Sequence, residues 1–365
     1  MKILAFSDLH LDTPFAWAPP GLARARRQAL RDTLQRICHL AATEQVDAVA
    51  CAGDLYEHDR FTPDTVRFVA DQLGGLGRPV FLAPGNHDWY GPASLYRQAH
   101  WSSTVHVFTQ DRLEPFELAD GVTLWGAAHR APANTEGFLD GFTVDRGGIN
   151  LALFHGSEQG ALPWQDAGKR PHAPFTESQI EAAGLDHAFC GHFHSPKLAT
   201  RHTYPGNPDP LTFGETGQRG AVIATVAADG SVDRTVHPVA TTTVQDVTVH
   251  LRDASHADHV RQQVEAGIAD LTGIVRVTVS GEVGPDVDID LADLRGLGRH
   301  LDGLVTRLGS ISVAYDLDRL AEEPTVRGQF VRDVRAAPGL DEDTRRRVLI
   351  TGLRALSGRA DLEVH

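Results

Sequence analysis

Five short polar clusters in the first 194 residues carry side chains that could bind metal ions. Each cluster directly follows an apolar run of the kind that forms a buried strand. The clusters are DLH at 8–10, GD at 53–54, GNHD at 85–88, HG at 155–156 and GHFH at 191–194. Because the carboxyl ends of neighbouring strands in an α/β sheet open on one crevice, we expect these clusters to converge.

The donors in these clusters are carboxylates, imidazoles and one amide, without any thiolate. This mixture suits hard or borderline divalent ions such as manganese, iron or zinc. The candidate ligands are Asp8, His10, Asp54, Asn86, His155, His192 and His194. They are too many for one ion, so the sequence predicts two ions that share a bridging carboxylate.

Side-chain alternation along an extended chain places Asp8 and His10 on the same face, where both can reach one ion. The same reasoning applies to His192 and His194 if that segment is extended, although the pair could also divide between two ions. Taken alone, each cluster also fits a surface histidine, a capping aspartate or a turn. The ordered set of five indicates a two-metal site.

Glycine stands inside three of the clusters, at positions 53, 85 and 191. A residue without a side chain is needed where the backbone turns sharply beside a ligand or approaches a phosphate closely.

Alternating strands and helices position the clusters. Strands are expected at 3–6, 46–52, 79–83, 122–126, 151–154 and 188–190, and helices at 21–43 and 65–73. This rhythm predicts an α/β core. The strands expected at 221–227 and 232–236 flank the turn residues Asp229 and Gly230 and predict a hairpin.

The threonines at 241–243 mark a linker to a second α/β unit. This unit is predicted to contain strands at 244–251, 274–281 and 311–317 and helices at 256–271 and 291–308. Amphipathic helices at 326–336 and 341–356 form a tail. We therefore expect three parts, at 1–240, 244–318 and 322–365.

The composition is that of a soluble globular protein, with 34 basic and 48 acidic side chains and a formal net charge of −14. An acidic protein repels phosphate backbones on average, but bound divalent cations can reverse the field at a cleft. The sequence shows no membrane span and no secretory signal, so we expect a cytoplasmic protein. The three cysteines, Cys38, Cys51 and Cys190, are predicted to be buried free thiols.

The ordered set DLH, GD, GNHD, HG, GHFH resembles the calcineurin-like metallophosphoesterases. Within that superfamily the sequence is similar to the DNA repair exonuclease branch of SbcD-like nucleases, especially its shorter bacterial members. The matching segments are DLHLDTPF at 8–15, VDAVACAGDLYEHD at 46–59, PGNHD at 84–88, YPGNP at 204–208 and FGETGQRG at 213–220. The resemblance covers residues 1–240 and implies a β-sandwich core flanked by helices, followed by a small α/β capping domain and a helical tail.

The resemblance also implies a role for each site residue. Asp8, His10 and His194 would hold the first metal, Asn86, His155 and His192 the second, and Asp54 would bridge them. His87 would lie over the phosphate and protonate the leaving oxygen or stabilise the transition state. Glu57 stands where related phosphatases have an aspartate that orients this histidine; Asp59 and Asp88 are rivals for that role, and an exposed loop glutamate is the alternative.

The function implied is that of a manganese-dependent DNA exonuclease that hydrolyses phosphodiester bonds in DNA repair, with iron and zinc as alternative metals. The implied partners are DNA and an SMC-like coiled-coil ATPase; a homodimer is left open. The basic residues 345–347 precede an apolar helix face of Val348, Leu349, Leu353 and Leu356, which either docks on the ATPase or packs on the capping domain.

Two other functions share this sequence pattern. A small-molecule phosphodiesterase, for example one acting on cyclic nucleotides, would need the same seven ligands. A binding module that has lost its activity is disfavoured by the intact ligand set, and a protein phosphatase is disfavoured by the missing DRG motif after Glu57.

Overall fold

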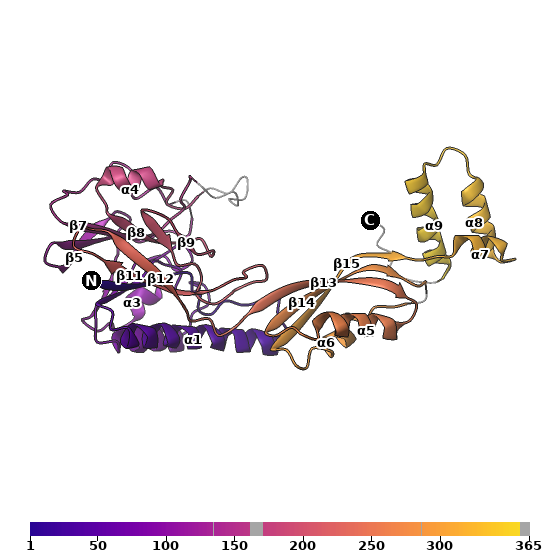
Figure 1. The fold of residues 1–365 in the computed structure, drawn as a ribbon, viewed down its shortest axis with the longest axis horizontal. Coiled ribbons are helices and arrows are strands. Elements are labelled where there is room, and N and C mark those ends of the chain that lie inside the picture. The colour runs from indigo at the N-terminus through magenta and orange to yellow at the C-terminus, as the bar shows by residue number, and fades with distance from the viewer. Residues whose placement is uncertain (134, 161–170, 286, 358–365) are drawn as a thin grey trace. The chain divides into compact units, whose positions relative to one another are not determined.

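The computed structural model describes residues 1–133, 135–160, 171–285 and 287–357 (Figure 1). The chain divides into two compact units, Met1–Val244 and Gln245–His365. The first unit carries all five polar clusters.

Two six-stranded sheets form the first unit. The first sheet has the order β12-β11-β1-β2-β3-β4, with β1 (Lys2–Phe6), β2 (Ala48–Cys51), β3 (Val80–Leu82), β4 (Val105–Val107), β11 (Gly220–Val226) and β12 (Val232–Pro238). The second has the order β5-β6-β7-β8-β10-β9, with β5 (Glu114–Ala119), β6 (Val122–Gly126), β7 (Ile149–His155), β8 (His187–Gly191), β9 (Lys197–Leu198) and β10 (His202–Tyr204). The strands β1 to β4 pair in parallel, as do β6 to β8, and the predicted hairpin is confirmed as β11 and β12.

An apolar layer joins the two sheets face to face. On β1, Ile3 and Ala5 belong to this layer, whereas Leu4 and Phe6 pack on the opposite face, as strand alternation requires. The first sheet contributes mainly small side chains on or beside β1, β2 and β3, namely Ala5, Ala48, Ala50, Ala52 and Ala83. The second sheet contributes larger ones, namely Leu124, Leu151, Leu153 and Phe189.

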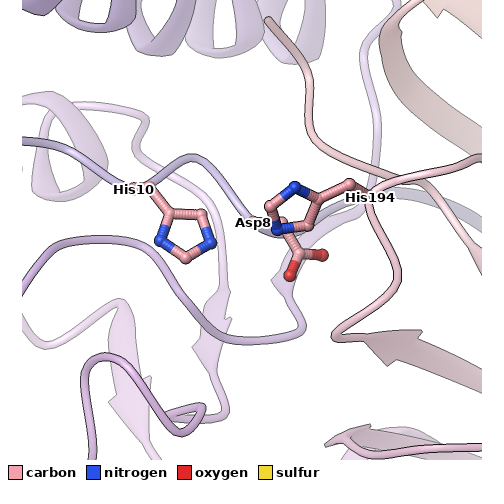
Figure 2. Close-up of side chains that lie close together, drawn as sticks. All are labelled: Asp8, His10 and His194. Carbon is pink, nitrogen blue, oxygen red and sulfur yellow. The ribbon is translucent and has the colours of Figure 1, made fainter. Parts of the chain in front are cut away.

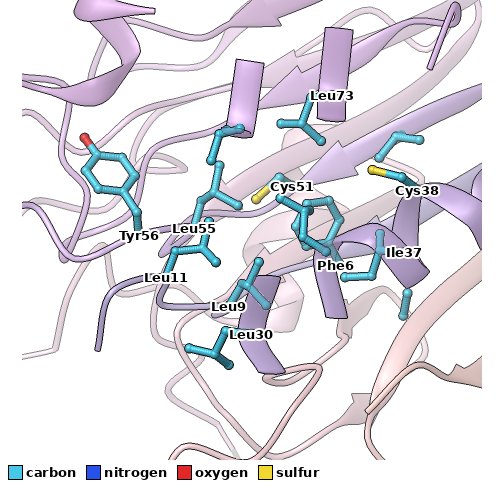
Figure 3. Packing of buried hydrophobic residues seen from close by; sticks show 14 of the residues in the cluster. Phe6, Leu9, Leu11, Leu30, Ile37, Cys38, Cys51, Leu55, Tyr56 and Leu73 are labelled. Atoms are coloured by element: carbon cyan, nitrogen blue, oxygen red, sulfur yellow. The ribbon is translucent and has the colours of Figure 1, made fainter. Parts of the chain in front are cut away.

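Helices cover the outer faces of the sandwich. The outer face of the first sheet packs against α1 (Pro20–Thr43) and α2 (Pro63–Gly74), and Figure 3 shows Ile37 of α1 beside Phe6 and Leu30 of α1 beside Leu9. The outer face of the second sheet packs against α4 (Glu177–Ala183). The short helix α3 (Leu95–Gln98) adds Leu95 to the core under the first sheet. The predicted fold class, an α/β sandwich flanked by helices, is confirmed.

The second unit contains a three-stranded sheet of β13 (Val244–Ala254), β14 (Ile274–Val283) and β15 (Gly303–Val313). The helices α5 (Ala257–Ile268) and α6 (Leu291–Arg295) share a hydrophobic core with this sheet. Its core includes Val260 and Val264 of α5 packed with Val277 and Val279 of β14.

The helix predicted at 291–308 is wrong. Leucines at spacings of three and four suggested it, but α6 ends at Arg295 and the chain enters β15 at Gly303, which pairs in parallel with β14. Gly296 and Gly298 weaken a helix at this point, and the alternating burial of Leu304 and Thr306 fits a strand. Of the strand predicted at 311–317, residues 311–313 are the end of β15, whereas the chain then leaves the sheet and a helix begins at Leu317.

The tail forms a small helical core of its own. It contains the predicted helices as α8 (Val326–Ala336) and α9 (Glu342–Leu356), together with an unpredicted helix, α7 (Leu317–Glu322). Leu349 and Leu353 of α9 pack with Leu320, Val331 and Val334 of the two other helices. Part of the predicted apolar face is therefore covered within the tail itself.

Two residues of that face remain open, since Val348 is 38% exposed and Leu356 is 45% exposed. Within the basic triplet, Arg345 has an internal role because its Nη1 donates hydrogen bonds to the Val334 and Ala337 carbonyls at the end of α8.

The remaining sequence expectations concern membranes and thiols. Among the described residues, no helix has both the length and the apolarity required to cross a bilayer. The three cysteines are buried and free, as predicted. Burial raises the pKa of Cys38 to about 12, so its thiol is protonated at neutral pH.

Candidate metal centre

The five polar clusters meet at one edge of the sandwich. The first sheet supplies Asp8 and His10 after β1, Asp54 after β2 and Asn86 after β3, and the second supplies His155 at the end of β7 and His192 and His194 after β8. The loops that follow β1 and β2 are joined by backbone hydrogen bonds from Asp8 N–H to Gly53 O and from His10 N–H to Asp54 O, both 2.9 Å. The oxygen donors thus come from one sheet and three of the four imidazoles from the other.

A first group of ligand atoms consists of Asp8, His10 and His194, one atom from each, all within 4.8 Å of one another. Figure 2 shows the Asp8 carboxylate next to the His194 ring, with the His10 ring to their left. Asp8 and His10 are buried, with 0% and 3% of their surface exposed. These are the three residues that the resemblance assigns to the first metal.

The expected cause of this proximity, side-chain alternation along a strand, is wrong. β1 ends at Phe6, and Asp8 and His10 both have left-handed backbones, with φ of 54° and 50°. His192 also departs from an extended conformation, with φ of 112°. Such conformations are costly for residues other than glycine and cluster at functional sites, where surrounding contacts hold them.

A second group contains Asn86, His155 and His192. Asn86 Oδ1 lies 3.0 Å from His155 Nε2 and 3.3 Å from His192 Nδ1. His192 and His194 therefore divide between the two groups, which is the second of the two arrangements considered from the sequence.

The Asp54 carboxylate lies between the groups. Its Oδ2 is 3.3 Å from His155 Nε2 and 3.6 Å from His10 Nε2, and its Oδ1 accepts the His87 N–H at 2.8 Å. Burial raises the pKa of this carboxyl, but the neighbouring histidines, His155 above all, outweigh burial and lower the pKa well below its usual range. Asp54 is therefore an anion that faces both groups.

The orientation of the imidazoles fits a cation. His155 Nδ1–H donates to Ala52 O at 2.9 Å, so its Nε2 faces the oxygens of Asn86 and Asp54 with a lone pair unless a proton or metal ion occupies it. Burial lowers the pKa of His155, but the Asp54 carboxylate outweighs burial and raises the pKa to about 9. The Nε2 atom of His10 is buried and, within the described part of the chain, has no hydrogen-bond partner. These donors fit divalent metal ions held between the two sheets.

Glu57 contacts two histidines at once. Its Oε1 lies 2.8 Å from His10 Nδ1 and its Oε2 lies 3.1 Å from His87 Nδ1. Burial raises the pKa of Glu57, but these hydrogen bonds outweigh burial and lower the pKa to about 2. The hydrogen bond to Glu57 raises the pKa of His87 to about 9, against the opposing effect of burial. Because the His87 side chain is 47% exposed, its ring also reaches solvent at the edge of the site.

The rival carboxylates lie elsewhere. Asp59 is exposed, whereas Asp88 is fully buried and accepts the backbone N–H groups of Asp54, Leu55 and Gly85 at 2.6 to 3.1 Å. Asp88 also accepts the Tyr96 hydroxyl at 2.5 Å. Asp88 thus fixes the loop that presents Asp54, and Glu57 is the carboxylate that contacts His87.

Sequence reasoning assigned no role to Glu215. Its Oε1 lies 2.7 Å from Nδ1 of His194 in the first group. The signal was present in the segment FGETGQRG, which carried the family resemblance without an interpretation of its glutamate.

Glycine allows the sheets to approach at this edge. A Cβ added at Gly191 would collide with Ala52 O and lie 2.7 Å from His155 Nδ1. At Gly53, where φ is 93°, a Cβ would lie 2.7 Å from His155 Nδ1 as well. Both positions confirm that the backbone approaches a candidate ligand too closely for any side chain.

The calcineurin-like phosphoesterase family matches residues 1–196, more than half of the chain. The chain belongs to this family. The family expectation drawn from the ordered clusters is confirmed, and the groups of ligand atoms found in this phosphoesterase agree with a dimetal centre.

Curated relatives of this phosphoesterase include two archaeal proteins named DNA double-strand break repair protein Mre11. The one from Methanopyrus kandleri is 27% identical over 60% of this chain, and the match spans about half of that relative's length, 52%. The one from Halobacterium salinarum is 24% identical over 94% of this chain and 95% of its own length. Among solved structures, a dimetal phosphatase from Danio rerio matches 61% of this chain and 92% of its own, with 11% identity and a TM-score of 0.37.

The close approach at Gly191 can be tested with Gly191→Ala. The added methyl group must displace the Ala52 carbonyl or the His155 ring, so we expect a loss of about 1–3 kcal/mol in the free energy of unfolding together with weaker metal binding. Urea unfolding and manganese titration measure the two effects. Gly21→Ala is the control, because a Cβ there meets nothing within 4 Å; equal stability of the two variants would contradict the packing described.

Proposed function

We propose that this calcineurin-like phosphoesterase is a manganese-dependent DNA exonuclease that hydrolyses phosphodiester bonds in DNA repair. The observation that carries the proposal is the pair of ligand groups on either side of Asp54, in a chain of this family. Iron and zinc are the alternative metals for the same donors.

In this proposal Asp8, His10 and His194 hold the first ion, Asn86, His155 and His192 hold the second, and Asp54 bridges them. The short distances among the atoms within each group support this allocation. When bound, two such ions activate a water molecule and neutralise the phosphate oxygens in an in-line displacement.

His87 is the proposed general acid. Glu57 accepts its Nδ1–H, which leaves Nε2–H as the proton that His87 can give to the leaving oxygen. The raised pKa of His87 supports this role, since the ring carries both protons at neutral pH. The same Glu57 carboxylate lies against His10, so one side chain positions a proton donor and a metal ligand together.

DNA is the proposed substrate because the curated relatives are named for DNA double-strand break repair and the motifs of residues 1–240 resemble the repair exonuclease branch. We propose a cytoplasmic enzyme that works with an SMC-like coiled-coil ATPase, and we assign the units accordingly: residues 1–240 the nuclease, 244–318 a capping domain and 322–365 the docking segment. The exposed Val348 and Leu356 on α9 support docking there.

The substrate class can be tested directly. The purified chain with manganese should shorten linear DNA, and a chelator should stop the reaction because the ions supply the nucleophile. Gel analysis of end-labelled DNA follows the products. Hydrolysis of cyclic nucleotides without any action on DNA would replace the proposal with a small-molecule phosphodiesterase.

The general acid can be separated from the metal ligands. His87→Ala should lower turnover by about 10²- to 10⁴-fold while the bound metal stays near two ions per chain, since His87 is not a ligand in this proposal. Elemental analysis beside rate measurements checks both. The control is His39→Ala, an exposed histidine on α1 that should leave both quantities unchanged; loss of metal from the His87 variant would show that His87 is a ligand.

The docking segment can be tested without truncating the tail. Val348→Glu places a charge on the open part of α9 and should abolish co-purification with an SMC-like coiled-coil ATPase, while nuclease activity remains. Arg346→Glu on the same helix tests whether charge alone is responsible. Undiminished co-purification of the Val348 variant would exclude this face as the docking site.

A further inference from the structure

We propose that Glu215 is a positioning residue that selects the tautomer of His194, so that His194 Nε2 is free to bind the first metal ion. This inference rests on the proposed metal centre and adds to it a residue outside the seven ligands.

One oxygen of Glu215 determines the state of the His194 ring. Its Oε1 lies 2.7 Å from Nδ1 of His194, and a carboxylate can only accept a hydrogen bond. Nδ1 therefore carries the proton, and the lone pair of the neutral ring is on Nε2. A carboxylate that fixes the tautomer of a ligand histidine also raises its basicity toward a metal ion.

The other oxygen of Glu215 fixes the carboxylate. Its Oε2 accepts hydrogen bonds from Asn207 Nδ2 and Leu211 N–H, both at 2.6 Å, and from Thr212 N–H at 3.3 Å. Because three N–H donors face this single position, it must be occupied by a hydrogen-bond acceptor such as an oxygen atom. The loop 207–212 thus dictates which way the side chain of residue 215 faces.

The backbone of His194 is held by the same segment. Its carbonyl accepts hydrogen bonds from Arg219 Nη1 at 2.5 Å and from Asn207 N–H at 3.2 Å. Arg219 Nε in turn donates to the Glu215 carbonyl at 3.0 Å. Ring and backbone are therefore both positioned by residues 207–219.

The arrangement repeats on the other imidazole of the first group. His10 Nδ1 faces Glu57 as His194 Nδ1 faces Glu215, at 2.8 Å and 2.7 Å. In the second group, His155 Nδ1 faces the neutral carbonyl of Ala52 instead. The two proposed metal sites thus differ in the charge behind their histidines.

The substitution Glu215→Gln tests whether the carboxylate selects the tautomer of His194. The three N–H donors of residues 207–212 will hold the amide oxygen, which directs the amide NH₂ at His194 Nδ1. That nitrogen must then accept a hydrogen bond, so the proton moves to Nε2 and blocks metal binding. A nearly isosteric change should therefore remove one ion.

The experiment compares metal content and affinity in three versions of the full chain. After dialysis against manganese, we expect two ions per chain in the unmodified protein and one in Glu215→Gln, with first-site affinity reduced by about 10- to 100-fold. Glu158→Gln is the matched control and should retain both ions. Glu158 is a carboxylate only 3% exposed that pairs with Lys197 at 3.1 Å and accepts the Gly160 N–H at 2.7 Å; among the described residues its side chain makes no hydrogen bond or ion pair with a candidate ligand.

The outcomes separate this inference from the proposed function. Two ions with unchanged affinity in Glu215→Gln would overturn the role of Glu215 and leave the metal centre standing. Fewer than two ions in the unmodified chain would overturn the metal centre, and the role of Glu215 with it.

A second measurement is made on the unmodified chain and does not depend on the folding of Glu215→Gln. In the zinc-loaded, ¹⁵N-histidine-labelled chain, nuclear magnetic resonance should show His194 protonated on Nδ1, with its signal assigned by comparison with His194→Gln. Protonation on Nε2 would overturn the inference.

Discussion

The buried Asp54 carboxylate faces the imidazoles of His155 and His10 at the edge of the sandwich, and contacts throughout the first unit hold these groups in place. Asp54 is anionic, His155 and His10 turn Nε2 toward it, and Asn86 adds a further oxygen. A buried carboxylate is costly unless it is paired and hydrogen-bonded, and Asp54 has the His155 ring and the His87 N–H as partners. Asp88 fixes the loop after β2, and residues 207–219 fix His194.

Much of this could be predicted from the sequence because the relevant signals are local. Apolar runs that end in polar clusters predicted β1, β2, β3, β7 and β8 and the candidate ligands that lie at or after their ends. The geometry after each strand was not accessible in this way, since the left-handed backbones of Asp8 and His10 depend on hydrogen bonds to a loop more than 40 residues away. Glu215 escaped for the same reason, because its importance arises from contact with His194, 21 positions earlier. In the second unit, leucine spacing favoured a helix where glycines and pairing with β14 produce a strand.

Some of the basic side chains counted in the net charge of −14 have partners inside the fold. Arg26 is buried against Asp209, Arg219 holds the His194 carbonyl, and Arg345 donates to carbonyls at the end of α8. These basic side chains serve the fold and are not available to a phosphate backbone. Under the proposed function, metal ions at the site would add positive charge there, and other basic side chains or the ATPase partner would supply the rest of the attraction for DNA.

The alanine-rich layer between the sheets has a consequence for the site at its edge. Candidate ligands follow strands of both sheets, so the distances among them depend on the interval between the sheets. Ala5, Ala48, Ala50, Ala52 and Ala83 make that interval short. The interior of the sandwich therefore bears on the site at its edge: the volume of the side chains between the sheets influences how closely the candidate carboxylates and imidazoles can meet.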